Sequence, residues 1–151
     1  MNIDLFGANG KYQESIEIDR EPSKFRGWDY TIYNRKARNQ GFVEVRLKLL
    51  KEFQEYESVT EPLVEIVDNE EEVIAEIQRF NPHGDKPIKP DLLRRGIGTF
   101  VLRNILTDVK DNGISYVYCC DPQPRFHRIL VKEGFEELDV DSKEVHLLMS
   151  L

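Results

Sequence analysis

The segment RRGIGTFVLRNIL, which starts at Arg94, places two arginines and two glycines directly before an apolar-periodic run. Apolar residues recur every four positions over 101–109, which predicts an amphipathic helix. N–H groups in the first turn of a helix lack internal partners, and the helix dipole adds partial positive charge there. Because glycine has no Cβ, Gly96 and Gly98 let this backbone approach a bulky anion. The segment therefore predicts a phosphate-binding site.

Basic residues in and before this segment would raise the local potential: Lys86, Lys89, Arg94 and Arg95. The alternative is an ordinary glycine turn into a helix, with solvated arginines. Two phosphate-binding motifs do not fit. A Rossmann fingerprint requires a small residue where Val101 stands and a strand directly before the glycines. A P-loop requires Gly-Lys-Ser/Thr, which the sequence lacks.

The 151 residues suit one domain, spanning 1–151, with a sizeable core. The net charge of −7 argues against an extended surface for nucleic acid or anionic membrane and permits cationic partners. The chain begins with no signal-peptide pattern and contains no bilayer-length apolar run, so we expect a cytoplasmic protein. Cys119 and Cys120 are adjacent, which makes a mutual disulfide strained, so two reduced thiols are expected.

The first half of the sequence is typical of β structure. Strands are predicted over 12–19, 28–34 and 43–49, followed by a short helix over 50–56. Residues 62–68 and 72–80 are predicted to form two strands of a hairpin. Residues 81–92 are predicted to be a loop, because three prolines lie within them.

The second half alternates helices and strands. The helix after Gly98 is predicted to end at Asn112-Gly113. A strand over 114–120, a helix over 124–132 and a last strand region within 140–151 are expected to follow. This order predicts an α/β (α+β) fold with helices packed on a sheet.

Residues 72–137 resemble the acyl-CoA-binding half of the GNAT N-acetyltransferase superfamily. The signature of that family, Gln/Arg-x-x-Gly-x-Gly/Ala, lies between a central strand and the next helix. Residues 93–98 (LRRGIG) match both glycines in the same frame. The family continues with a strand, a second helix and a closing Gly-Phe, which here are ISYVYCC, PRFHRILVK and Gly134-Phe135. The resemblance covers less than half of the chain.

The resemblance implies a mixed central sheet whose two central strands, over 73–80 and 114–120, splay apart to admit acetyl-CoA as co-substrate. The strand end at Gln78, Arg79 and Phe80 would pair with the pantetheine arm. The CoA pyrophosphate would bind the N–H groups of six consecutive residues: Arg94, Arg95, Gly96, Ile97, Gly98 and Thr99. The implied reaction is direct acetyl transfer to a primary amine.

The sequence departs from the family at several points. Leu93 stands where Gln or Arg is usual, and Leu130 where many members carry a tyrosine that protonates the departing CoA thiolate. The 81–92 loop is longer than usual, which suggests a lid or a part of the acceptor site. The first sixty residues do not show the family's usual pair of helices. These departures keep a second function open: a catalytically impaired CoA-binding or protein-interaction module of the same fold.

Two residues are candidates for catalytic roles. Glu76 in the central strand is the first candidate for a general base, and a solvated strand carboxylate is the alternative. His127 has a suitable intrinsic pKa, although a surface position on its helix is the alternative. Core packing is expected of Tyr116 and Tyr118, and Cys119 is not expected to be acylated.

The expected acceptor is a small-molecule or peptide amine, and a cationic one suits the acidic chain. Nucleic acid and membrane are not expected as partners, and a homodimer is left open. His83 and His146 have no neighbours at metal-ligand spacing in the sequence, so no metal site is predicted.

Overall fold

The structure is a computed structural model that describes residues 2–6, 12–34, 39–55, 57–84, 96–140 and 143–151. These residues form one eight-stranded sheet of order β1-β2-β3-β4-β5-β6-β8-β7. The strands are β1 (Asn2–Phe6), β2 (Tyr12–Pro22), β3 (Gly27–Asn34), β4 (Asn39–Leu49), β5 (Val73–Asn81), β6 (Tyr116–Cys120), β7 (Glu136–Glu137) and β8 (His146–Ser150). The helices are the 3₁₀ helix η1 (Leu50–Glu55), α1 (Glu57–Val67), α3 (Ile97–Asp111) and α4 (Pro124–Lys132).

The sheet is mixed, as the sequence predicts for an α+β fold. The pair formed by β5 and β6 is parallel, and the other neighbouring strands are antiparallel. A parallel pair needs a crossover, and α3 supplies it here between β5 and β6. The described residues up to Leu49 form strands and turns without a helix, which agrees with the expectation that the family's usual helix pair is missing there.

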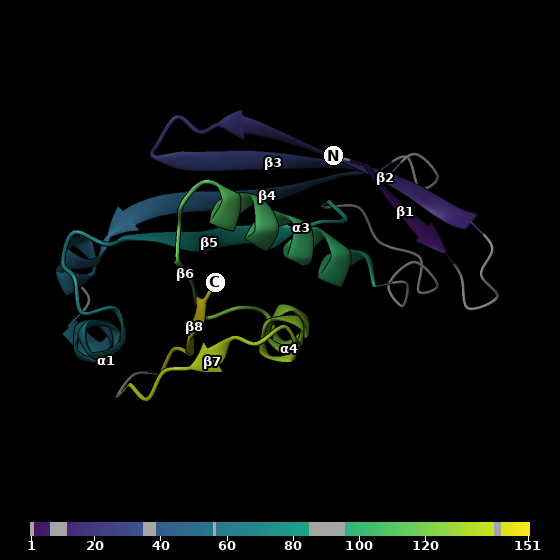
Figure 1. The fold of residues 1–151 in the computed structure, drawn as a ribbon. Coiled ribbons are helices and arrows are strands. Elements are labelled where there is room, and N and C mark those ends of the chain that lie inside the picture. Colours follow the sequence, from purple (N-terminus) through teal and green to yellow (C-terminus); the bar gives the residue numbers. More distant parts are fainter. Residues whose placement is uncertain (1, 7–11, 35–38, 56, 85–95, 141–142) are drawn as a thin grey trace.

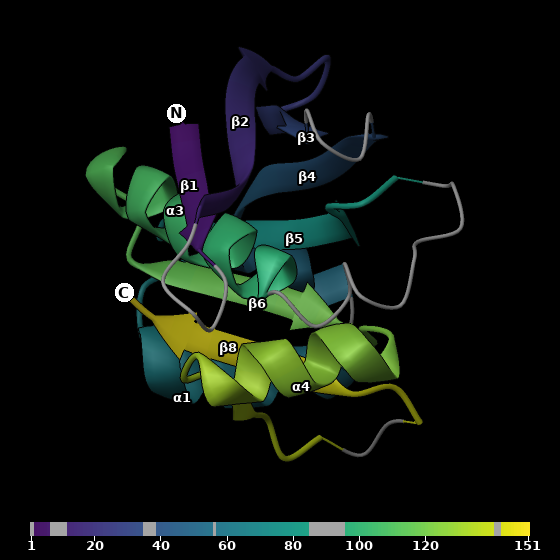
Figure 2. The ribbon, with the colours of Figure 1, turned by 90° about the vertical axis from the view of Figure 1, so that its right-hand side faces the viewer.

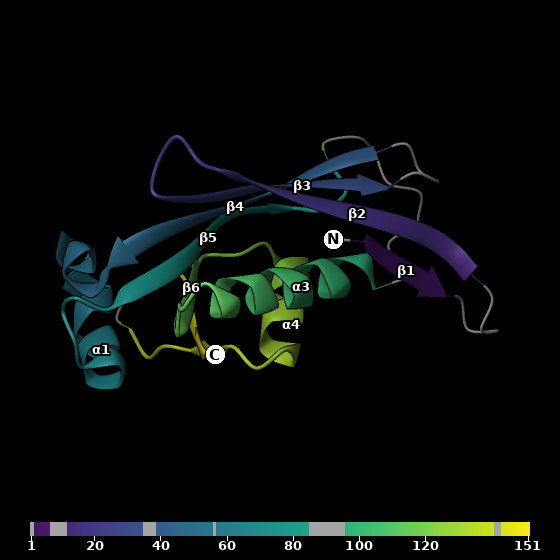
Figure 3. The same ribbon diagram turned by 45° about the horizontal axis from the view of Figure 1, so that its top comes forward.

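One face of the sheet is covered by α3 and α4 (Figures 1 and 3). The predicted apolar stripe of α3 is buried there, including Val101, Ile105 and Val109. It packs against strand residues such as Ile32 and Val45 in the larger of two core clusters. Asn112 caps α3, and Gly113 follows with φ of 83°, as the Asn-Gly pair predicts.

The opposite face carries a smaller core beneath α1 and η1. Leu63 and Val67 of α1 and Phe53 of η1 pack there against Tyr118 and Leu148. Figures 1 and 2 show that α1 and α4 lie on opposite sides of β6 and β8. The helices therefore sandwich the β6–β8 part of the sheet, and the site lies near it.

The predicted hairpin strand over 62–68 is wrong, because α1 occupies this segment. Its β-branched residues favour a strand locally, but burial follows a helical spacing. Leu63 and Val67, four residues apart, are buried, whereas Val64 and Ile66 are 39% and 46% exposed. The turn after Val67 and the strand from Val73 are confirmed. Among the described residues, no helix combines the length and the apolar character needed to cross a membrane.

Candidate functional site

The central strands β5 and β6 part partway along their length. They pair in register at Ile74↔Tyr116, Ala75↔Val117 and Glu76↔Tyr118, and no further pair follows. Strand β5 nevertheless continues to Asn81, still paired with β4 on its other side. Residues 77–81 therefore present one strand edge without a β6 partner. This is the predicted splay of the two central strands.

A β-bulge lies at the beginning of this free edge. Val45 of β4 is opposite Ile77, and the preceding Glu44 is opposite Arg79, so Gln78 is an extra residue in β5. A bulge removes backbone groups from the regular ladder and redirects them, which is why bulges are frequent beside active sites. The backbone at 77–79 is thus available to a ligand between the strands.

A cleft of about 380 Å³ occupies the space between the parted strands. Its walls are residues 77–81 of β5, residues 119–123 at and after the end of β6, and Phe126 of α4. The predicted pantetheine contacts Gln78, Arg79 and Phe80 all line it. The fold therefore brings these three residues to an open strand edge, where an extended amide-bearing chain would add as a strand.

A second cleft, of about 480 Å³, lies between the N-terminus of α3 and the side of α4. Gly96, Gly98 and Thr99 line it. The Ile97 side chain is instead buried in the core, only 2% exposed, which leaves its backbone as the part that a ligand could contact. Leu93, Arg94 and Arg95 lie outside the described residues, as do Lys86 and Lys89.

Glycine is needed at positions 96 and 98 for different structural reasons. Gly96 is the N-cap of α3 with φ of 73°, a left-handed conformation that side chains disfavour, and no side chain of the described residues caps the helix. Gly98 lies inside the first turn, where a Cβ would meet Ile129 Cδ1 at 3.1 Å and Phe80 Cε1 at 3.8 Å. Gly98 therefore keeps the mouth of the second cleft open beside uncapped N–H groups.

The rings of Phe80 and Phe126 stack where the two clefts meet. Their centroids are 4.0 Å apart and their planes differ by 4°. Both clefts share these rings, together with Asn81 and Gln123. A ligand that fills both clefts must pass this aromatic pair.

Three cations of α4 line the second cleft and were missed by the sequence reasoning: Arg125, Arg128 and Lys132. None forms an ion pair with a described residue. They lie three and four positions apart, which places them on one side of a helix. This spacing is the sequence signal by which the three cations could have been identified as one group. The lining contains no carboxylate among its described residues, so the cleft is basic in an acidic protein.

Glu76 occupies the last paired position before the strands part. Its side chain is 13% exposed, and its carboxylate accepts hydrogen bonds from Lys48 Nζ at 2.9 Å and Gln78 Nε2 at 3.1 Å. It shares a sheet face with Ile74, two residues before it, which is the α1 face. Glu76 is thus neither freely solvated nor in the lining of either cleft, but lies directly beside the opening.

The other candidate groups are less suited to chemistry. His127 is half-buried in α4 and lines neither cleft, and its buried Nε2 has no hydrogen-bond partner in the described part of the chain. Burial raises the pKa of the Cys119 thiol to about 12, so the thiolate needed for attack is scarce. Leu130 is fully buried, which leaves no hydroxyl at that position. Tyr116 and Tyr118 pack in the smaller core, as expected.

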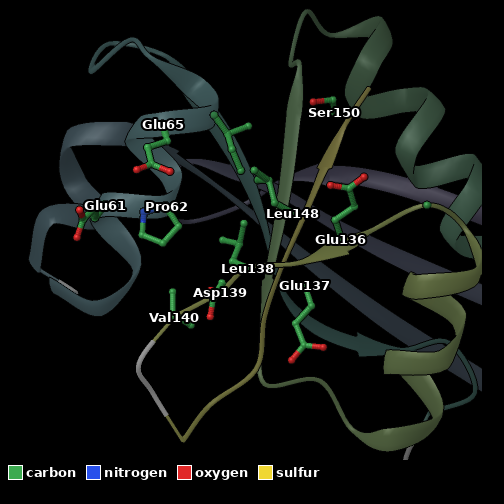
Figure 4. A pocket seen from close by; sticks show the side chains of 12 residues that line it. Glu61, Pro62, Glu65, Glu136, Glu137, Leu138, Asp139, Val140, Leu148 and Ser150 are labelled. Atoms are coloured by element: carbon green, nitrogen blue, oxygen red, sulfur yellow. The ribbon is translucent and has the colours of Figure 1, made fainter.

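A larger cavity, of about 670 Å³, lies away from the parted strands, between α1 and the β7–β8 edge (Figure 4). Glu61 and Glu65 of α1 form one wall. Glu136, Glu137 and Asp139 contribute carboxylates from the other side. It opens on the same sheet face as Glu76, and its five carboxylates make that side of the protein acidic.

Comparison with family models finds no match, and comparison with curated proteins finds none either. Solved structures do match. One is an apo variant of agmatine N-acetyltransferase, at TM-score 0.56 and 9% identity over 82% of this chain and 74% of that one. Another is described as arylalkylamine N-acetyltransferase 7 from the yellow fever mosquito, at TM-score 0.56 and 11% identity over 81% of this chain and 63% of that one.

Both similar structures are N-acetyltransferases of the GNAT type, and their similarity extends well beyond the segment that carries the sequence signature. The mixed sheet with parted central strands and the glycine-led helix after the first of them agree with this match. The chain therefore has the fold of the GNAT N-acetyltransferases.

Proposed function

We propose that the protein is an acetyl-CoA-dependent N-acetyltransferase that acts on a primary amine. The observation that carries the proposal is the junction of two clefts: one bounded by a free strand edge, the other by an uncapped, glycine-led helix start and three cations. An acyl-CoA has the matching chemistry, because an extended diamide arm connects its thioester to a diphosphate. The fold similarity supports the same class of reaction.

In the proposed complex, the diphosphate binds the N–H groups of Ile97, Gly98 and Thr99, as anions do at helix N-termini. Arg125 and Arg128 add charge-assisted hydrogen bonds from α4. The pantetheine arm passes Phe80 and pairs with the free edge of β5. This places the thioester near the bulge at Gln78, where the two strands converge.

The acceptor approaches from the α1 face, where Glu76 lies. Its neutral amine nitrogen attacks the thioester carbonyl carbon, and a backbone N–H near the bulge stabilises the oxyanion. Collapse of the tetrahedral intermediate breaks the C–S bond and releases the CoA thiolate. Glu76 accepts the proton that the amine loses, directly or through one water. The main contribution of the protein is to hold amine and thioester in line.

Calorimetry with acetyl-CoA, followed by thiol-release assays over a panel of amines, tests this proposal. Gly98→Val is the decisive variant, because a branched side chain would project into the second cleft. Gly98→Ala is its matched control, since one Cβ displaces only the flexible end of Ile129. We expect Gly98→Val to lose acetyl-CoA binding while Gly98→Ala and the unmodified chain bind. Equal binding by Gly98→Val would show that the diphosphate lies elsewhere.

A second function is favoured by one observation, the burial of Leu130. The position at which many GNAT enzymes carry a thiolate-protonating tyrosine is here part of the apolar core. A CoA-binding or protein-interaction module without catalysis would bind acetyl-CoA and release no thiol with any amine. Thiol release that depends on a particular amine rejects this alternative.

A further inference from the structure

A mixed set of metal-ligating side chains lies at the end of β6 and the beginning of β8. Cys120, Glu144 and His146 each offer one ligand atom, and these atoms lie within 4.8 Å of one another. Cys120 and His146 are direct cross-strand partners, and Glu144 lies in the bend two residues before His146. The Cys120 Sγ lies 3.4 Å from a carboxylate oxygen of Glu144.

His146 is buried, although only one of its two ring nitrogens has a hydrogen-bond partner among the described residues. It is only 3% exposed, and its Nδ1 lies 2.5 Å from the hydroxyl oxygen of Tyr118. Its other ring nitrogen, Nε2, is buried and has no hydrogen-bond partner among the described residues. Leaving a buried polar atom without a partner is energetically costly, so native proteins rarely keep one without a ligand, ion or water.

We propose that Cys120, Glu144 and His146 bind a thiophilic divalent cation, with Zn²⁺ as the best fit. Thiolate, imidazole and carboxylate together are a ligand set that zinc accepts, whereas Mg²⁺ and Ca²⁺ prefer oxygen ligands. Ligation through Nε2, one of the two ring nitrogens that the imidazole offers, would satisfy the unpartnered atom. The Nδ1–H then donates to the oxygen of Tyr118, an outer contact of the kind that orients metal-bound histidines.

The geometry requires little rearrangement. Ligand atoms around a tetrahedral zinc ion lie roughly 3–4 Å apart, slightly closer than the limit observed here. Cys120 is partly exposed and Glu144 is exposed, so a cation can enter from solvent. Three protein ligands leave a fourth position for water. On binding, the Cys120 thiol transfers its proton to solvent, and its thiolate sulfur forms the bond to the metal.

Sequence spacing gives no sign of this cluster, because its members come from strands that are distant in the chain and paired only in the fold. The proposal is independent of acetyl-CoA binding. Cys120 also lines the cleft between the parted strands, so a bound cation would lie at one wall of that cleft.

Titration of the reduced full chain with Co²⁺, a spectroscopic substitute for Zn²⁺, tests the proposal. We expect one equivalent to produce a sulfur-to-cobalt charge-transfer band, and Zn²⁺ to abolish it by displacement. Cys120→Ser should remove the band and weaken Co²⁺ binding on the order of a hundredfold or more. Cys119→Ala is the matched control, because this neighbouring thiol faces the opposite core and should leave the band intact.

A measurement on the unmodified chain removes any dependence on how the variants fold. Zn²⁺ should slow alkylation of Cys120 by a thiol reagent, followed by mass spectrometry of the peptide, and Mg²⁺ should not. The proposal is overturned if the unmodified chain gives no cobalt band, if Zn²⁺ leaves the alkylation rate of Cys120 unchanged, or if the band survives in Cys120→Ser and disappears in Cys119→Ala.

Discussion

At the scale of single residues, Glu76 has the position that a proton acceptor needs. It is the last β5 residue that pairs with β6, and its carboxylate is held by Lys48 and Gln78 beside the opening. Two fixed donors restrict the rotamers of the side chain, which gives the carboxylate a defined direction. Because the carboxylate is already oriented, it loses little conformational entropy when it acts on a substrate.

The variant Glu76→Gln keeps the shape of the side chain and removes its basicity. We expect kcat for amine acetylation to fall about 10²- to 10⁴-fold, the usual contribution of a general base. The Kd for acetyl-CoA, measured by calorimetry, should not change. Glu71→Gln is the control, because Glu71 forms a comparable ion pair with Lys51 but is 68% exposed in the turn before β5. Full turnover by Glu76→Gln would assign the base to another group.

At the scale of elements, the position of α3 decides where its N-terminus points. Asp108, near the other end of α3, accepts hydrogen bonds from Arg20 at 3.0 Å and from the hydroxyl of Tyr30 at 2.7 Å. Burial, followed by the Asp108 carboxylate, raises the pKa of Tyr30 above its usual value, so this hydroxyl keeps its proton and remains a donor. The helix is thereby fastened to β2 and β3.

Asp108→Ala should lower the free energy of unfolding by about 1–3 kcal/mol, because it leaves the buried Tyr30 hydroxyl without its acceptor. Denaturant titration measures the effect. Asp111→Ala, at an exposed position of the last turn of α3, should change stability by less than about 0.5 kcal/mol. Equal effects of the two substitutions would mean that the contact with Tyr30 and Arg20 does not fasten the helix.

The cations of α4 make an independent contribution to the second cleft. Replacing Arg125, Arg128 and Lys132 together by glutamine should weaken acetyl-CoA binding on the order of tenfold at low salt, since exposed charges contribute up to about 1 kcal/mol each. The difference from the unmodified chain should shrink as salt rises. Lys110→Gln, in the last turn of α3, is the control. A difference that does not depend on salt would contradict an electrostatic role.

Elements with a regular apolar pattern over many residues could be predicted from the sequence. Elements that are stabilised by residues distant in the sequence could not. The stripe of α3 and its Asn-Gly end are local signals, and both are confirmed. The β-branched residues of segment 62–68 are a local signal that favours a strand, whereas its helical state depends on a core around Leu63 that comes from other parts of the chain. The strands β1 and β7 lie at the two edges of the sheet and span only five and two residues, which is too short a pattern to be recognised.

The same distinction applies to the site. The two glycines and the β5 end were predicted through the family signature, and they line the clefts. The pairing of Phe80 with Phe126 was not predicted, because it joins elements more than forty residues apart in the sequence. The predicted roles of Arg94 and Arg95 stay predictions, since these residues lie outside the described part of the chain.

At the scale of the whole molecule, three residue pairs are the only β-ladder contacts between β5 and β6 among the described residues. On one side lie β1–β5, and on the other β6, β8 and β7. The core around α3 and α4 spans this junction, with residues from both parts of the sheet. The ladder that joins the two parts of the sheet is therefore short at the place where the proposed ligand binds.

Hydrogen exchange can detect occupation of this junction. Acetyl-CoA should slow amide exchange of the peptide that contains residues 77–81, because its free strand edge would gain hydrogen-bond partners. Peptides from β3, whose residues 28–34 pair with β2 on one side and β4 on the other, should exchange at unchanged rates. Uniform slowing across the sheet would instead indicate global stabilisation by linkage.

The parted strands also have a mechanical consequence. A substrate arm lying along β5 would act as a temporary ninth strand. It would connect the two parts of the sheet, whose direct ladder within the described residues is the short pairing of β5 with β6. The molecule would then become stiffer when acetyl-CoA binds and more flexible again when CoA, without its acetyl group, is released in each turnover.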